Sequence, residues 1–388
     1  MNSAPWDEEP AVILDNGSGN IKCGFAGEEV PRFVFPNIIA TPKQRQGPTP
    51  VYVGDDALAH THTERGLRYS HPMAHGIVSD WDAMARVWTH AYDALRADPA
   101  AQAVLLTEAP HNPTQHREQM AAVLFEHFAV PALQVQIQAV LALYAAGRTD
   151  GLVLDSGDGV THVVPIVEGH AVTPAVRRLE LAGREVTEWM MELLSDELQR
   201  PFTTSADREV ARMVKERLCY VAQSFEEELE KAEAQETSTT AESFTLPDGE
   251  TIKITRSRFC CPEILFTPAI AEKPYESIQR TIVDSVEACP IDLRRRLLNN
   301  VVLSGGNTMF GGMQQRLENE LKELVNKRAA EDVHVVAANE RKFSVWIGAA
   351  ILGSLTSFSS EWITKQEYEE NGPSILHKRC DSLAFVSK

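Results

Sequence analysis

The sequence predicts an α/β fold that contains an internal duplication. Two segments about 140 residues apart, 12–19 and 152–159, share one pattern: a short apolar run, an Asp, and a turn rich in Gly. A third apolar run, 301–304, precedes a pair of Gly residues. Such runs indicate buried strands, and α/β proteins bind ligands at the carboxyl ends of their strands. We therefore expect two similar halves with a ligand between them.

The elements of the first half follow from apolar periodicity and from start and stop residues. Asp80 marks the start of a helix within 77–95, and Gly147 is a suitable stop for another helix. The polar segment 41–66 contains at most one strand, at 51–53. The other elements expected are a β-meander over 11–40, a strand at 103–107, and helices at 114–128 and 134–147.

The second half repeats the strand and turn pattern from Leu152 onward. Its expected strands are 301–304 and 333–337, and a hairpin turn is expected at 247–249. Its expected helices are 183–198, 206–232, 278–289, 293–299, 311–327 and 343–355.

The two Asp–Gly turns indicate a site for phosphate and metal. Gly lets the backbone approach a ligand closely, and turns of this kind present several N–H groups to one anion. Asp15 and Asp155 supply the oxygen ligands that Mg²⁺ prefers. Either Asp alone would more often cap its own turn, so the duplicated context carries the prediction.

The composition argues against several classes of protein. A net charge of −18 disfavours non-specific binding to nucleic acid or to anionic membranes. The six Cys residues form no C-x-x-C pair, which argues against a zinc site and a disulfide framework. The N-terminus lacks the regions of a signal peptide, and no apolar run is long enough to span a bilayer. No Walker A pattern is present.

An ordered set of motifs resembles the actin family, comprising actin and the actin-related proteins, along nearly the whole chain. Gln138, His162 and Trp346 stand in place within it. The matching segments are 14–27, 75–78, 105–110, 137–148, 154–165, 181–184, 215–221, 246–249, 303–306, 340–348 and 363–374.

The resemblance implies the actin-type, ribonuclease H-like duplicated fold, in which two large domains of two subdomains each surround a nucleotide cleft. The implied subdomains are subdomain 1 at 1–36, 76–145 and 344–388, subdomain 2 at 37–75 with a shortened loop, subdomain 3 at 146–182 and 276–343, and subdomain 4 at 183–275.

The resemblance also implies roles for single residues. Asp15 and Asp155 would hold Mg²⁺ largely through water, with Ca²⁺ as a substitute in vitro. Gln138 would orient the attacking water, His162 would assist proton movement, and Asp155 belongs to the catalytic set. The implied ATP/ADP contacts are Gly17, Ser18, Gly19, Asn20, Lys22, Gly157, Asp158, Gly159, Val160, Gly183, Arg184, Lys215, Glu216, Gly305, Gly306, Met309, Phe310 and Lys342.

The implied function is that of a cytoskeletal Mg·ATP-binding protein with weak ATPase activity. It would act as a filament-forming subunit or as a subunit of a larger actin-containing assembly. The alternative is a non-polymerising actin-related protein in a dynein or axonemal, dynein-activator or chromatin-remodelling complex. A sugar kinase or chaperone-like ATPase of the same fold is an alternative of another class, although no motif supplies a kinase base.

The expected partners are the protein itself or other actin-family subunits, together with actin-binding or complex-specific proteins. Direct nucleic-acid binding and membrane insertion are not expected. The expected location is the cytoplasm and cytoskeleton, with the nucleus and cilium left open.

Four departures from actin concern contacts outside the ATP pocket. The loop at 45–51 is shorter than in actin and contains Pro48 and Pro50, the segment 271–276 is more polar, His170 replaces a tyrosine, and 381–388 extends the C-terminus. The altered loop modestly favours a subunit of a fixed complex over a polymer.

Overall fold

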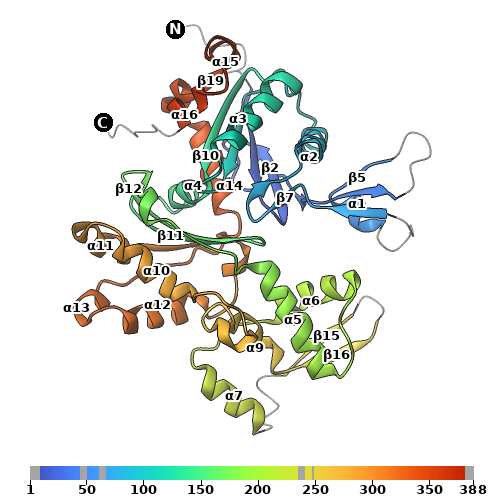
Figure 1. The fold of residues 1–388 in the computed structure, drawn as a ribbon, viewed down its shortest axis with the longest axis vertical. Coiled ribbons are helices and arrows are strands. Elements are labelled where there is room, and N and C mark those ends of the chain that lie inside the picture. The colour runs from blue at the N-terminus through green and yellow to red at the C-terminus, as the bar shows by residue number, and fades with distance from the viewer. Residues whose placement is uncertain (1–8, 44–49, 61–66, 235–240, 247–248, 381–388) are drawn as a thin grey trace. The chain divides into compact units, whose positions relative to one another are not determined.

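The computed structural model describes residues 9–43, 50–60, 67–234, 241–246 and 249–380 (Figure 1). Most of the shortened loop at 45–51, the turn residues 247–248 and the extension 381–388 lie outside these ranges. The chain forms two compact units. Unit 1 comprises Met1–Val153, Ile166–Thr173 and Phe343–Lys388, and unit 2 comprises Leu154–Pro165 and Pro174–Lys342. The finer division into four subdomains stays a prediction.

Unit 1 is built on a mixed six-stranded sheet in the order β19-β10-β9-β1-β2-β3. The central strands β10, β9 and β1 are parallel, whereas β1, β2 and β3 form the expected antiparallel meander. The strands are β1 (Val12–Asn16), β2 (Asn20–Phe25), β3 (Phe33–Pro36), β9 (Val104–Glu108), β10 (Ala132–Ile137) and β19 (Ile363–Thr364).

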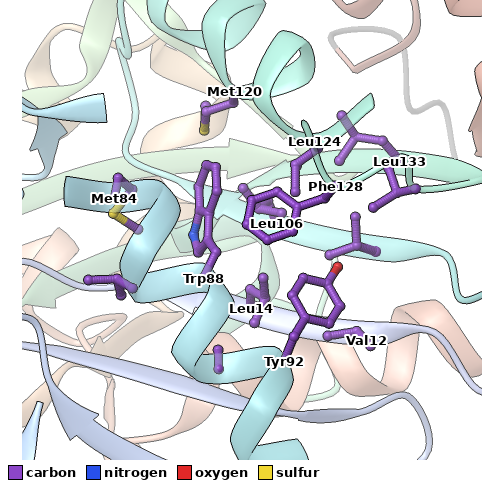
Figure 2. Packing of buried hydrophobic residues seen from close by; sticks show 14 of the residues in the cluster. Val12, Leu14, Met84, Trp88, Tyr92, Leu106, Met120, Leu124, Phe128 and Leu133 are labelled. Carbon is purple, nitrogen blue, oxygen red and sulfur yellow. The ribbon is translucent and has the colours of Figure 1, made fainter. Parts of the chain in front are cut away.

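One face of this sheet carries the main apolar core of unit 1. Helix α2 (Trp81–Leu95) packs Trp88 and Tyr92 against Leu14 and Leu106 of the sheet (Figure 2). Asp80 caps the helix, because its carboxylate accepts a hydrogen bond from the Ala83 N–H at 3.0 Å. The expected helix-start signal at Asp80 is therefore confirmed.

Helices α4 (Gln138–Ala145) and α14 (Ser344–Ser354) pack closely against each other in unit 1. A Cβ atom on Gly348 would lie 1.9 Å from the carbonyl oxygen of Leu141, so only glycine permits this approach. Trp346 is fully buried, and its indole N–H donates to the Ile13 carbonyl at 3.4 Å. These contacts fix α14 against both α4 and strand β1.

Two expectations for unit 1 are wrong in part. The helix expected at 134–147 begins only at Gln138, because residues 133–137 of strand β10 pair with β9. The polar segment 41–66 contains the expected strand near 51–53, but also a short helix and the end of a second strand. Ala57 of this helix packs with Ile38, Ala40 and Leu67, which flank the segment. The elements concerned are β4 (Ile39–Pro42), β5 (Tyr52–Val53), α1 (Asp55–Ala59) and β6 (Leu67–Ser70), with the sheet order β5-β4-β6.

The remaining elements of unit 1 are short. The helix expected at 114–128 is an α-helix followed by a π-helix over Val123–His127. The other elements are β7 (Met73–Ala74), β8 (Ile77–Val78), α3 (Thr114–Ala122), β13 (His170–Ala171), α15 (Lys365–Asn371) and α16 (Ile375–Cys380).

The second large sheet has the strand order β13-β12-β11-β17-β18, with β14 paired to β12. The chain passes between the two units inside strands β11 and β12. The strands of unit 2 are β11 (Gly151–Ser156), β12 (Thr161–Val167), β14 (Arg177–Leu179), β15 (Glu242–Thr245), β16 (Thr251–Ile254), β17 (Val301–Ser304) and β18 (Val335–Val336).

The helix expected at 206–232 is also wrong, because the chain forms two helices there. Val221 leaves the helical path to donate to the Gly311 carbonyl at 2.8 Å, and Ser224 then caps the second helix. The helices of unit 2 are α5 (Gly183–Leu198), α6 (Ser205–Leu218), α7 (Phe225–Glu233), α9 (Ser257–Glu263), α10 (Ile278–Glu287), α11 (Ile291–Leu298), α12 (Met313–Leu324) and α13 (Lys327–Ala330). Among the described helices, none is long and apolar enough to cross a membrane.

Candidate functional site

Polar side chains gather at the carboxyl ends of the parallel strands of unit 1. Leu14 and Leu106 face the core under α2, so alternation places Asp15 and Thr107 on the opposite face of the sheet. Gln136 is the register partner of Thr107 on the neighbouring strand and shares this face. The sheet therefore brings together residues from three separate parts of the chain, as ligand sites in α/β folds require.

Asp15 is the centre of this cluster and is almost fully buried. Its Oδ1 atom accepts hydrogen bonds from Thr107 Oγ1 at 2.7 Å and from Gln138 Nε2 at 3.2 Å. Its Oδ2 atom forms an ion pair with Lys22 Nζ at 2.5 Å. Burying a carboxylate is costly unless it is paired and hydrogen-bonded, and these three donors meet that requirement.

The turn after β1 has its carbonyl groups bound from outside. Asn37 donates through its backbone N–H to the Gly19 carbonyl at 2.9 Å and through Nδ2 to the Gly17 carbonyl at 3.0 Å. Ser18 Oγ accepts from the Gly76 N–H at 2.8 Å. Within the described part of the chain, the N–H groups of Gly17, Ser18 and Gly19 donate to no other residue. The turn can therefore offer them to an anion.

The corresponding turn of unit 2 is attached to the first residues of α5. Gly183 N–H donates to the Gly157 carbonyl at 2.9 Å, and Arg184 N–H donates to the Asp158 carbonyl at 2.8 Å. A Cβ on Gly183 would lie 3.0 Å from that Gly157 oxygen, so this position favours glycine. Asp155 is half-buried at the end of β11. The loop and the helix terminus are thus fixed as one piece.

The third Gly-rich loop contacts the second. Gly305 has a φ of +89°, and a Cβ there would lie 2.2 Å from the Ser156 carbonyl oxygen and 3.0 Å from Asp155 Oδ1. Asn307 Nδ2 donates to Ser156 Oγ at 2.9 Å. The Gly-rich loops at the ends of β11 and β17 therefore adjoin each other.

Lys215 is the most buried lysine of the expected set. Its ammonium donates to the Gly183 carbonyl and to Thr187 Oγ1, both at 2.8 Å. Burial lowers the pKa of Lys215 below its ordinary value. The lysine links α6 to the start of α5, the helix terminus that Gly157 also contacts.

The other expected residues differ in exposure. His162 is buried in β12, whereas Glu216 is exposed and pairs with Arg212. Met309 is 38% exposed and Phe310 is buried. Asn20 is exposed in β2, and Gly159 and Val160 lie in the turn after β11. A Cβ placed on Gly306 would lie 4.0 Å from a side-chain carbon of Lys342.

Sequence reasoning missed three polar residues of the unit 1 cluster. Thr107 bonds both Asp15 and Gln138, Asn16 accepts from the Trp88 indole at 3.1 Å, and Asn37 holds the Gly turn. Thr107 had one usable signal, since it is the first polar residue after an apolar strand. Asn37 had none, because its role depends on a turn far from it in the chain.

Among the described residues, no group of three or more His, Cys, Asp or Glu side chains could hold a metal ion. Mg²⁺ is usually bound through one or two carboxylates, phosphate oxygens and waters. Both Asp15 oxygens already accept protein donors, yet a carboxylate has about four acceptor positions. Asp15 therefore fits a water-mediated contact to Mg²⁺ better than direct ligation.

A comparison with protein families gives one match over nearly the whole chain. The family model described as Actin matches residues 6–381 of 388. The chain belongs to the actin family. Its fold is accordingly of the actin type, with mixed α/β content in several sheets. ATP binding with a divalent metal is typical of this family, as are weak ATPase activity and association with other family subunits.

A hollow of about 800 Å³ on this actin-family protein has none of the Gly-rich turns in its lining. It is lined in unit 1 by α2, the π-helix and β5, with Trp81, Arg86, His90 and His127 among its residues. None of the expected nucleotide contacts lines it.

Proposed function

We propose that this actin-family protein binds Mg·ATP through its Gly-rich turns and hydrolyses it slowly to ADP and phosphate. The observation that carries the proposal is the buried cluster of Asp15, Thr107 and Gln138 beside a turn with unused N–H groups. Positioning and charge neutralisation supply most of the catalysis in phosphoryl transfer. A preorganised, largely buried set of donors supports that chemistry.

In this proposal each residue has a defined task. The N–H groups of Gly17, Ser18 and Gly19 bind phosphate oxygens, and the loop from Gly157 to Val160 has the same role, although its Gly157 N–H donates to the Val160 carbonyl at 3.0 Å. Asp15 and Asp155 orient waters of the metal, which supplies charge neutralisation when bound. Gln138 orients the attacking water, and His162 assists its loss of a proton.

Substitution of Gln138 by alanine tests the catalytic part of the proposal. We expect Gln138→Ala to retain Mg·ATP affinity and to slow hydrolysis, because the change removes the water-orienting amide but no phosphate donor. The measurements are single-turnover phosphate release and displacement of a fluorescent ATP analogue. Gln315→Ala, an exposed change on α12, is the control. Unchanged hydrolysis in Gln138→Ala would remove the assignment.

Substitution of Asp155 by alanine tests the metal part. We expect Asp155→Ala to abolish or severely weaken Mg·ATP binding, with Asp196→Ala, an exposed change on α5, as the control. Normal nucleotide affinity in Asp155→Ala would show that its carboxylate does not support the metal.

The ATPase is proposed to act as a subunit of a filament or of a larger actin-containing assembly in the cytoplasm. The two versions differ in self-association. Sedimentation of the purified protein with Mg·ATP over a concentration range distinguishes them, because filaments pellet above a threshold concentration and a fixed-complex subunit stays monomeric. Robust phosphoryl transfer to sugars in vitro would instead support the kinase alternative.

A further inference from the structure

The Thr107 hydroxyl lies at the junction of the unit 1 cluster. It donates to Asp15 Oδ1 at 2.7 Å and accepts from the Asn16 N–H at 3.0 Å and from Gln138 Nε2 at 3.3 Å. A threonine hydroxyl has one donor and two acceptor positions. All three are used, so the hydroxyl has a single orientation. Thr107 is 1% exposed, so its hydroxyl is shielded from bulk water.

This arrangement also fixes which way the Gln138 amide faces. Its Nε2 atom lies within hydrogen-bonding distance of Asp15 Oδ1, the Asn16 carbonyl oxygen and Thr107 Oγ1. A carboxylate and a carbonyl oxygen can only accept hydrogen bonds. A flipped amide would place Gln138 Oε1 against both of them, without any donor. The NH₂ group must therefore face the cluster, and Oε1 must face away from it.

We propose that Thr107 is a positioning residue, whose hydroxyl holds Gln138 so that Oε1 is presented as a hydrogen-bond acceptor for the attacking water. The inference rests on the proposed ATPase function and adds to it a hydroxyl that helps to hold the catalytic amide, whose direction is set by Asp15 Oδ1 and the Asn16 carbonyl. An acceptor in this place accepts a hydrogen bond from the water and thereby turns an oxygen lone pair of the water toward the reacting phosphate. Thr107 touches neither reactant and acts through Gln138.

The alternative role for Thr107 is structural. Its hydroxyl satisfies the buried N–H of Asn16, and an unsatisfied buried donor costs about 1–3 kcal/mol. That role would change stability and leave the hydrolysis step unaffected once the protein is folded. The two roles are separated by kinetics measured on folded protein.

The experiment uses the full chain with Thr107→Val, Thr107→Ser, Gln138→Ala and the double variant Thr107→Val/Gln138→Ala. Single-turnover ATP hydrolysis and Mg·ATP affinity are measured for each, with folding checked by circular dichroism. We expect Thr107→Val to slow hydrolysis by about 10- to 100-fold, the effect of misplacing a catalytic group, and to bind ATP normally. Thr107→Ser keeps the hydroxyl and is expected to retain the wild-type rate.

The double variant provides the decisive comparison. If Thr107 acts through Gln138, adding Thr107→Val to Gln138→Ala causes no further loss of rate, because interacting residues are not additive. The inference would be overturned if the rate loss of the double variant equalled the product of the two single rate losses. It would also be overturned if Thr107→Val hydrolysed ATP at the wild-type rate. If Thr107→Val does not fold, Thr107→Ala replaces it. If neither variant folds but Thr107→Ser does, the hydroxyl is required for stability, and this result would also overturn the inference. A wild-type protein that neither binds nor hydrolyses ATP would refute the proposed function itself.

Discussion

Gly305→Ala is the substitution whose effect the structure specifies most closely. The backbone of Gly305 has a φ of +89°, which an L-amino acid with a side chain adopts only with strain. A left-handed conformation costs about 1–2 kcal/mol. The new Cβ would also lie 2.2 Å from the Ser156 carbonyl oxygen, about 1 Å inside ordinary contact. Relieving such an overlap by moving backbone costs about 1–3 kcal/mol.

The two terms together predict a loss of about 2–5 kcal/mol in the free energy of unfolding. Stabilities of folded domains are about 5–15 kcal/mol, so this loss is a large part of the total. Gly306→Ala is the matched control. Its Cβ would have no atom closer than 4.0 Å, and its backbone φ is not in the positive region. We expect that variant to be as stable as wild type, or slightly more stable because its unfolded chain is less flexible.

Urea unfolding of nucleotide-free protein, followed by circular dichroism, measures the difference between the two variants. Hydrogen exchange of peptides from β11 and β17 locates it, since the overlap lies between the ends of these strands. Both variants must be compared without ATP, because a bound ligand adds its own stabilisation. Equal stability of Gly305→Ala and Gly306→Ala would refute the reasoning from backbone contact.

Three further predictions concern stability. Gln136→Leu is expected to leave the free energy of unfolding unchanged or to raise it by about 1 kcal/mol, because within the described residues the buried Gln136 Nε2 has no hydrogen-bond partner. A clear drop in the unfolding free energy measured with urea would show that a buried water satisfies this group. Lys215→Met tests the lowered pKa of Lys215. Native Lys215 binds fewer protons than the unfolded chain between that lowered pKa and 10.5, so wild type gains stability relative to the variant as pH rises through this window; a difference independent of pH would contradict it. Thr204→Ala removes the α6 cap, whose hydroxyl accepts from the Asp207 N–H at 3.1 Å, and is expected to lower the unfolding free energy by about 1 kcal/mol, whereas no change in the urea midpoint would count against a capping role.

The Gly-rich turns were predictable from sequence because their geometry is local. An apolar run followed by Asp and Gly specifies a strand and a tight turn with few alternatives. Strands β1, β11 and β17 accordingly lie where the pattern placed them. The helix α5 was also predicted with its bounds, since its start and its apolar spacing lie within one short segment.

Strand β10 shows where local pattern fails. Residues 134–147 carry one continuous helical pattern, yet the first four pair with β9. Pairing with a buried neighbouring strand outweighs weak local propensity. The break between α6 and α7 has the same cause, because the bond from Val221 to Gly311 competes with the helical bonds of a single longer helix.

The sequence by itself determined the family, the Gly-rich turns and the residues proposed for phosphate chemistry. Only the tertiary structure decided how those residues are held. Asp15, Thr107 and Gln138 belong to three segments that approach each other through parallel strand register, and their hydrogen bonds give Gln138 its direction. The reason is physical: turn geometry depends on neighbours along the chain, whereas the orientation of a buried amide depends on donors and acceptors that sheet pairing brings from far away in sequence.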